Sequence, residues 1–219
     1  MKITKFLILI AFSGCATFPT NNIAPGYLET FNSIKNAIIG FESDGYITRD
    51  LVNNIPYASM TLKIGKGPKG LLILESINND ELTWISADPI YLVIKNGRII
   101  KTEGLDNDLK EIIYPELNFK QIFDQNIEKF NVFYSYRNPE LNNLELHFNY
   151  SLIGKESITI LDEVLELSLI HEVVSNNTLG WKFTNKYWID SDYFIWKSYQ
   201  TINPKIPVFN MEVTKKPSS

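Results

Sequence analysis

Short apolar or alternating segments, separated by turn residues, follow one another from Tyr57 to Val213. Alternation of period two, together with enrichment in Val, Ile, Tyr, Phe and Trp, predicts β-strands. We predict strands over residues 57–64, 70–77, 81–86, 90–95, 98–103, 130–136, 144–152, 157–161, 164–174, 181–189, 193–201 and 207–213. So many antiparallel strands cannot remain one flat open sheet. The sequence therefore predicts a mainly β fold in which the strands curl into a half-barrel or a flattened barrel.

Turn residues separate these strands, and the sharpest turn signal is Asn96-Gly97. Both residue types tolerate positive φ values, so the pair predicts a tight two-residue hairpin. The stretch 105–128 is less regular. Its apolar residues Leu117, Ile122 and Phe123 indicate short helical or looped packing over one end of the sheet.

An amphipathic helix is predicted over residues 27–41, before the first strand. Its apolar residues are spaced by three and four positions and share one helical face; they are Leu28, Phe31, Ile34, Ile38 and Phe41. Such a stripe most often faces a core, although a membrane surface or a partner could also cover it. We expect this helix to plug or line the curved sheet.

The first fourteen residues have the order of a signal peptide. Lys2 and Lys5 precede the apolar segment 6–12, and Ser13-Gly14 precede Cys15, the only cysteine of the chain. The apolar segment is far shorter than the roughly 20 residues that a membrane-spanning helix needs. Residues 12–15 resemble the lipobox at which lipoprotein signal peptides are cut. Residues 1–14 are therefore predicted to be removed.

Cys15 is the predicted lipid attachment site, because a cysteine placed directly after such a signal is the residue that is acylated in lipoproteins. Several attached chains, such as palmitate, suffice for stable anchoring to a membrane. Residues 15–26 then form a tether rich in Pro, Asn and Thr, and residues 27–219 a single domain. Ala16 resembles the enterobacterial sorting pattern that sends a lipoprotein to the outer membrane, facing the periplasm.

Composition excludes some partners and predicts a folded chain. Hydrophobic residues make up 44% of the sequence and charged residues 21%, which is ordinary for a folded domain. The formal net charge is -4 and becomes more negative once Lys2 and Lys5 are removed. Binding to nucleic acid driven by phosphate contacts is therefore not expected.

Catalytic and metal-binding signatures are scarce. His147 lies in an alternating segment on its polar face, and His171 follows three leucines at even spacing, which predicts a neutral core histidine. No cluster has the ligand spacing of zinc, so we predict no metal and no cofactor. Carboxylates such as Asp88 paired with Asp190 or Glu212 could in principle act as in a glycosidase. We nevertheless expect the chain not to be an enzyme.

Aromatic residues are dense in the predicted strands and are the best candidates for ligand contact. Trp84, Trp188 and Trp196 are singled out as ligand-binding candidates, since exposed rings stack on the faces of sugars. Packing in the core is the commoner role for each of them.

Several segments together resemble the YjbF/GfcB family of group 4 capsule and exopolysaccharide lipoproteins. They occur in the same order, and they are IPYASM at 55–60, WISAD at 84–88, NGRIIKTEGL at 96–105, YWID at 187–190 and WKSYQ at 196–200. The region 106–143 matches poorly, and the Gly that usually follows YWID is replaced by Ser191-Asp192-Tyr193. The resemblance implies a periplasm-facing outer-membrane lipoprotein with some likeness to the half-barrels of lipoprotein carriers, and it implies no catalytic residue.

Three functions are compatible with these observations. The first is an outer-membrane lipoprotein that supports capsule or exopolysaccharide assembly or export without catalysis, by contacting export proteins or polysaccharide. The second is a periplasmic carrier that holds an acyl chain in the curved sheet, and the third is a polysaccharide hydrolase. A cavity lined by Leu, Ile and Phe would favour lipid, whereas two or more exposed Trp or Tyr rings in a groove would favour sugar.

Overall fold

The computed structural model describes residues 47–87, 90–115 and 117–217. The predicted signal peptide, Cys15, the tether and the helix over 27–41 lie outside the described residues, as does Asp88. These features remain predictions.

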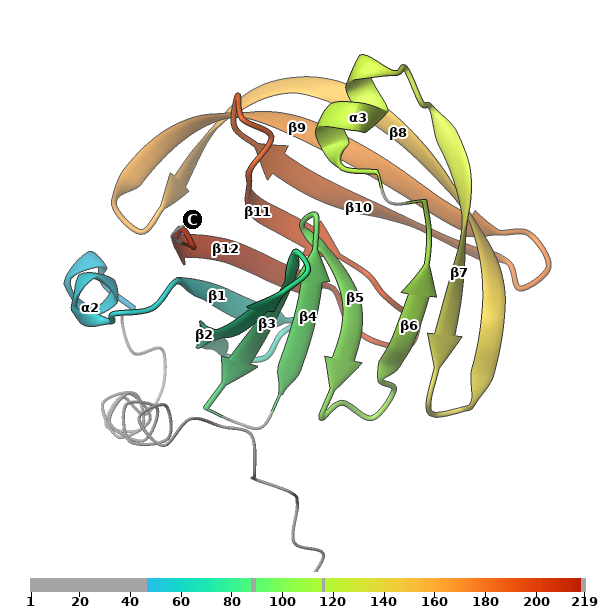
Figure 1. Ribbon diagram of the computed structural model, residues 1–219, viewed down its shortest axis with the longest axis horizontal. Helices are drawn as coiled ribbons and strands as arrows, with labels where there is room; N and C mark the ends of the chain where they lie inside the picture. Colours follow the sequence, from blue (N-terminus) through green and yellow to red (C-terminus); the bar gives the residue numbers. More distant parts are fainter. Residues whose placement is uncertain (1–46, 88–89, 116, 218–219) are drawn as a thin grey trace, which may run out of the picture.

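The described residues form twelve strands and two short helices, labelled in Figure 1. The strands are β1 (Ser59–Ile64), β2 (Lys69–Asn78), β3 (Glu81–Ser86), β4 (Tyr91–Lys95), β5 (Arg98–Glu103), β6 (Leu109–Ile113), β7 (Lys129–Tyr136), β8 (Leu141–Ile160), β9 (Glu163–Asn176), β10 (Trp181–Ile189), β11 (Ile195–Gln200) and β12 (Phe209–Lys215). The helices are α2 (Arg49–Asn54) and α3 (Phe119–Asp124). The mainly β prediction is confirmed.

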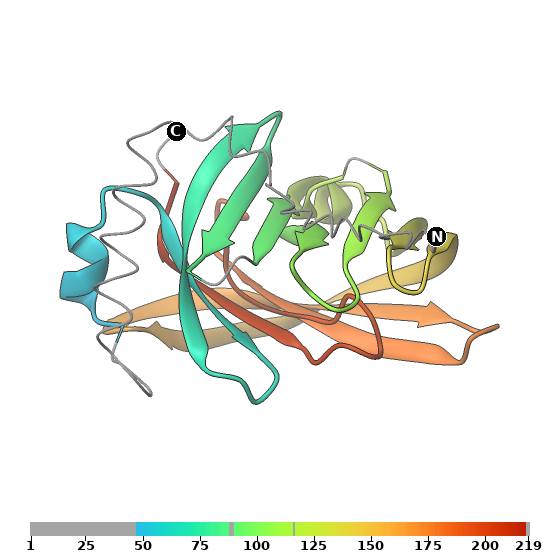
Figure 2. The same cartoon turned by 90° about the horizontal axis from the view of Figure 1, so that it is seen from below.

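All twelve strands belong to one antiparallel sheet in the order β5-β4-β3-β2-β1-β12-β11-β10-β9-β8-β7-β6. The sheet curls until its two edge strands, β5 and β6, approach each other (Figure 1). Side chains bridge the two edges, because Thr102 Oγ1 donates to Asp108 at 2.9 Å and accepts from the Leu109 N–H at 2.9 Å. The result is a nearly closed, barrel-like sheet, which we call the half-barrel because β5 and β6 are not paired by backbone hydrogen bonds. Figure 2 shows the long strands β8, β9 and β10 as one layer, with the β2–β5 region rising from it.

The predicted strands agree with the observed ones except in two places. The two strands predicted over 144–152 and 157–161 correspond to the single strand β8, which ends at Ile160 and continues through a register shift between Leu152 and Gly154. A bulge of this kind bends a strand without ending it. The stretch 105–128 contains the short helix α3, as expected, but also the unpredicted strand β6.

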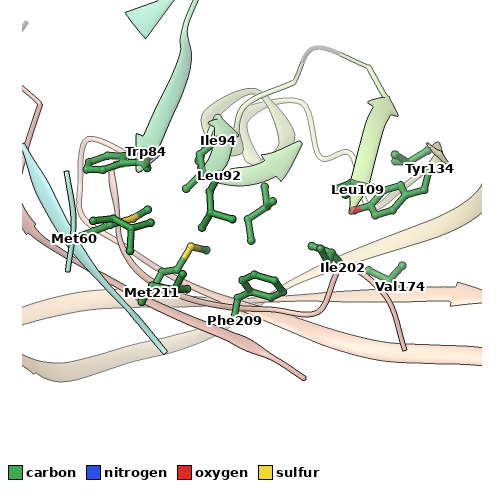
Figure 3. Packing of buried hydrophobic residues seen from close by; sticks show 14 of the residues in the cluster. Met60, Trp84, Leu92, Ile94, Leu109, Tyr134, Val174, Ile202, Phe209 and Met211 are labelled. Atoms are coloured by element: carbon green, nitrogen blue, oxygen red, sulfur yellow. The ribbon is translucent and has the colours of Figure 1, made fainter. Parts of the chain in front are cut away.

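The core fills the inside of the curved sheet. Alternation places one face of each strand inward, so that Phe209 and Met211 of β12 are buried in the core, whereas Glu212 points to the other face. Figure 3 shows Met60, Trp84 and Met211 packed together at one end of this cluster, with Tyr134 and Val174 at the other. The half-barrel is therefore packed with side chains along most of its length.

The two short helices lie at opposite ends of the molecule (Figure 1). Asn118 begins α3 with a capping box, in which its side chain accepts from the Gln121 N–H and the Gln121 side chain accepts from the Asn118 N–H. The helix packs Phe119 and Ile122 against Tyr187 inside the barrel end. Helix α2 lies at the opposite end, near the tip of the β8–β9 hairpin (Figure 1).

Candidate functional site

A cavity of about 550 Å³ lies on the inner face of the half-barrel. This size is typical of pockets for small molecules and lipid chains. Its lining comes from strands far apart in the sequence, which the curled sheet brings together. The buried part of the wall is formed by Met60, Trp84, Ile94, Phe119, Met211 and Ser198, whereas Asp80, Lys120 and Asp192 stand exposed at the margin.

The structure separates the three tryptophans that were singled out. Trp84 and Trp196 both line the cavity. Trp188 is not among the lining residues. It packs with Leu167 and Leu169, in a cluster that Trp196 also contacts, and its Nε1 donates to Glu156 at 2.7 Å. Ligand contact by Trp84 and Trp196 stays a prediction that their position supports.

Trp84 has an unusual feature for a buried indole. Its side chain is only 2% exposed, yet its Nε1 donor has no hydrogen-bond partner among the described residues. Buried polar groups are nearly always paired, so an unpaired donor in a cavity wall calls for an explanation. An acceptor atom of a ligand in the cavity would satisfy it.

The β4–β5 hairpin turn forms part of the cavity wall through Asn96 and Gly97. Both residues have positive φ values, +49° and +74°, as the tight-turn prediction requires. A Cβ atom built on Gly97 would lie 1.6 Å from Cδ1 of Ile195, on the facing strand β11. Only glycine therefore allows this turn to pack against β11.

A buried ion pair fixes the same hairpin inside the barrel. Arg98, the residue after the turn, donates from Nε to Glu172 of β9 at 3.0 Å, and both side chains are less than 5% exposed. Glu172 also accepts from Tyr150, from Asn185 at 2.9 Å and from Tyr187 at 3.0 Å. A carboxylate with four donors is well compensated for the loss of water.

The groups around this pair keep the Tyr187 phenol protonated and the Arg98 guanidinium charged. Burial raises the pKa of the Tyr187 phenol well above its ordinary value, and the nearby Glu172 raises it further. The phenol therefore stays protonated and donates to Glu172. Burial works to lower the pKa of Arg98, but Tyr150 and Glu172 more than offset it, so that the guanidinium stays charged. Its Cζ lies 4.5 Å from the centre of the Phe119 ring, which adds a cation–π contact.

A second polar group lies on the β10–β11 loop beside the cavity. Asp190 accepts from Nε1 of Trp196 at 3.0 Å and from Nζ of Lys216 at 2.9 Å. The Lys216 ammonium also lies 4.7 Å from the centre of the Trp196 ring. This contact ties the C-terminal end of the described chain, including the cavity-lining Pro217, to the loop.

Of the candidate carboxylates, Asp88 lies outside the described residues, and Asp190 and Glu212 are absent from the lining of the cavity. Glu212 instead binds Lys69 and Lys197, each at 2.8 Å. Asp80 and Asp192 do line its margin.

The histidines lie away from the cavity. His147 is exposed on the polar face of β8, as predicted. His171 shares a face with Leu167 and Leu169, as its spacing indicated, but that face is the outer one and the imidazole is only half-buried. Its expected position in the main core is therefore wrong. Among the described residues no group of three or more His, Cys, Asp or Glu side chains could hold a metal ion.

The Arg98–Glu172 pair is a feature that the sequence patterns above do not predict. Arg98 belongs to a hairpin motif, and Glu172 follows His171 in a strand whose leucines point outward. The available signal was the alternation Ile170, Glu172, Val174, which places a carboxylate among apolar residues of the inward face. Such a residue requires a buried cation, but alternation cannot say which one.

The buried part of the cavity wall is largely apolar. It offers aliphatic, thioether and aromatic surface, with one serine and one N–H donor that has no partner among the described residues. In addition, no helix within the described residues is long and apolar enough to cross a membrane.

A half-barrel of antiparallel strands with a cavity on its inner face defines the structural class of this protein. The family model described as group 4 capsule polysaccharide lipoprotein gfcB, YjbF matches residues 30–214. The chain belongs to this family, as the sequence motifs indicated.

Two Escherichia coli K12 proteins are similar in sequence. The uncharacterized lipoprotein GfcB is 26% identical over 144 residues, covering 64% of this chain and 67% of GfcB. The uncharacterized lipoprotein YjbF is 25% identical over 177 residues, covering 78% of this chain and 81% of YjbF. The crystal structure of the hypothetical lipoprotein YmcC from Escherichia coli shares the fold, with a TM-score of 0.68 and 20% identity over 86% of this chain and 97% of that one.

Proposed function

We propose that this protein is an outer-membrane lipoprotein, anchored through Cys15 and facing the periplasm, that supports capsule or exopolysaccharide assembly or export by binding rather than by catalysis. Its membership of a capsule lipoprotein family gives the biological setting. The observation that carries the binding role is the cavity of about 550 Å³ inside the half-barrel.

The arrangement of charged groups supports a role without catalysis. The buried Glu172 accepts from four donors, and the partly exposed Asp190 accepts from Lys216 and Trp196. The carboxylates that line the cavity, Asp80 and Asp192, lie at its exposed margin. A general acid or base must instead be free to reach a substrate. The fixed hairpin and the Asp190 contact shape a rigid cavity, which suits a binding protein.

Deletion of the gene tests the proposed function directly. The surface polysaccharide of the deletion strain is measured and compared with that of the parent and of a strain carrying the gene on a plasmid. We expect less surface polysaccharide, restored by the wild-type gene. Unchanged polysaccharide would refute the role in capsule or exopolysaccharide assembly.

A Cys15→Ala variant tests the anchor separately. Without the thiol no lipid can be attached, so we expect the protein to leave the outer-membrane fraction and labelled palmitate to be absent from it. An Ala16→Asp variant serves as the matched control for sorting, because it keeps the lipid and should move the protein to the inner membrane. Retention of Cys15→Ala in the outer membrane would contradict anchoring through this residue.

A further inference from the structure

The buried part of the cavity wall combines a hydrocarbon-like interior with one buried donor, Nε1 of Trp84, that has no partner among the described residues. Met60, Ile94 and Met211 provide flexible or branched aliphatic surface, and all are less than 10% exposed. Methionine adapts to chains of varied shape because its unbranched side chain changes rotamer easily. A ligand that fills this space must be largely apolar.

The margin of the cavity carries charges of both signs. Asp80, Asp192 and Lys120 are exposed there. A mixed margin suits a polar headgroup without strong net charge, whereas a dense set of cations would be expected for a highly anionic ligand. The cavity is therefore amphipathic, with an apolar interior and a polar entrance.

We propose that the cavity binds a single acyl chain of a lipid, and that the ester or amide carbonyl of that chain accepts a hydrogen bond from Nε1 of Trp84. Trp84 lines the cavity, and its Nε1 is buried without a partner among the described residues. The chain occupies the space beside Met60 and Met211, which Figure 3 shows next to Trp84. This inference rests on the proposed function, because it names the ligand of the cavity that the proposed binding role uses.

Sugar recognition fits the same wall less well. Sugars are bound by exposed aromatic faces together with many hydrogen-bonding side chains, because each hydroxyl that is removed from water must find a partner. Trp84 is only 2% exposed, and Trp196 and Tyr193, which also line the cavity, are partly buried. The Trp196 N–H is already used by Asp190, and most of the fully buried wall has no hydrogen-bonding group. Burying several hydroxyls there would leave most of them unpaired.

The test compares monoacylglycerols with 1-O-alkylglycerols of equal chain length, which differ only in the ester carbonyl. The protein is the mature chain from residue 15 with Cys15→Ser, which keeps every described residue and carries no lipid of its own. Calorimetry below the aggregation concentration of each ligand gives Kd. We expect binding to tighten about fourfold for each methylene added from eight to twelve carbons, as burial of one methylene predicts.

Trp84→Phe tests the donor, because phenylalanine keeps an aromatic ring and lacks the N–H. We expect monoacylglycerol binding to weaken about two- to tenfold, as for one lost hydrogen bond, and alkylglycerol binding to stay unchanged. Trp181→Phe is the matched control, since Trp181 is partly buried outside this cavity. This variant should bind both ligands with the Kd of the wild type. Equal weakening of ester and ether by Trp84→Phe would overturn the assignment of the donor.

Val213→Phe tests the location, because Val213 lines the cavity and a larger side chain would fill it. We expect at least tenfold weaker binding of every chain, whereas Val164→Phe, at a position that is 64% exposed, should bind normally. If Val213→Phe unfolds, Leu82→Phe fills the same cavity.

Absence of chain binding to the folded wild type, or binding of maltohexaose at this site in place of lipid, would overturn the inference. Neither result would affect the polysaccharide measurement in the deletion strain. A normal level of polysaccharide in that strain would refute the proposed function, whereas the lipid-binding result would remain as measured.

Discussion

At the scale of single residues, Gly97 combines two requirements that no other residue type meets. Its φ of +74° is strained for any residue with a Cβ, and Ile195 occupies the place where a Cβ would be. Gly180 has a similar φ of +64°, but nothing lies within 4 Å of its Cβ position. A comparison of substitutions at the two glycines therefore distinguishes the cost of backbone strain from the cost of steric conflict.

We expect Gly97→Ala to lower the free energy of unfolding by about 2 to 4 kcal/mol, because strain and overpacking add. Gly180→Ala should cost only about 1 kcal/mol, since it introduces backbone strain alone. Urea denaturation of both variants measures the difference. Equal costs would show that the hairpin moves away from Ile195 without penalty.

The Glu212 carboxyl makes the stability of the folded protein depend on pH. Burial works to raise the pKa of its carboxyl, but Lys197 and Lys69 outweigh burial and hold the pKa below the ordinary value of 4.5. The folded state thus releases this proton more readily than the unfolded state. The contribution of Glu212 to stability is therefore complete above about pH 5 and is lost as the pH falls through the lowered pKa.

We expect Glu212→Gln to lower the free energy of unfolding by about 1 to 2 kcal/mol at pH 7, and by progressively less toward pH 3. Urea denaturation at several pH values compares it with the wild type. Glu166→Gln, an exposed carboxylate of β9, provides the control. A cost of Glu212→Gln that stays constant between pH 7 and pH 3 would contradict this account.

At the scale of elements, the Arg98–Glu172 pair joins the β4–β5 hairpin to β9 across the inside of the barrel. These strands are far apart in the sheet order, so the pair connects opposite walls. A second bridge runs nearby, because Gln200 of β11 donates to the Gly97 carbonyl at 2.7 Å and accepts from the Ile99 N–H at 3.0 Å. The hairpin is thus held by side chains rather than by strand pairing alone.

We expect Arg98→Met to lower the free energy of unfolding by about 3 to 5 kcal/mol, because it leaves the Glu172 carboxylate buried without its cation. The double variant Arg98→Met/Glu172→Leu should cost less than the sum of its two single changes. A double-mutant cycle followed by urea denaturation measures this coupling. Additive costs would show that the pair contributes no specific interaction.

Element boundaries were predicted well where alternation and turn residues agree. The observed β3 and β5 have the predicted limits, because clear turn signals bound them. Strand β8 was divided in two, since the polar residues around Gly154 have the composition of a turn. There β9 supplies partners on both sides of Gly154, from His147 to Ile160 of β8, so pairing overrides local propensity.

At the scale of the whole molecule, Arg49 at the start of α2 connects parts of the fold that strand pairing leaves apart. It donates to Asp162 at 2.9 Å, to the Thr214 carbonyl at 2.9 Å and to the Ile160 carbonyl at 3.2 Å. It therefore fixes the tip of the β8–β9 hairpin to the end of β12. The Arg49 side chain is only partly buried, at 23% exposed. We therefore expect its contacts to resist local opening of the β8–β9 tip but to add little to the free energy of global unfolding.

We expect Arg49→Ala to increase hydrogen exchange at the β8–β9 tip about tenfold while changing the free energy of global unfolding by less than about 1 kcal/mol. Amide exchange followed by mass spectrometry measures the tip peptide. Arg137→Ala, at the exposed β7–β8 turn, should leave the tip unchanged. Unaltered exchange in Arg49→Ala would show that the tip is held by its own pairing.

The sequence by itself determined the strand content, the tight turn at Asn96-Gly97 and the family, because alternation, turn residues and ordered motifs are local properties of the chain. The tertiary structure alone decided which face of β9 points inward and which cation meets Glu172. It also decided that Trp84 and Trp196 share a cavity while Trp188 does not. These features depend on the curvature of the sheet, which brings distant strands together and which no local pattern encodes.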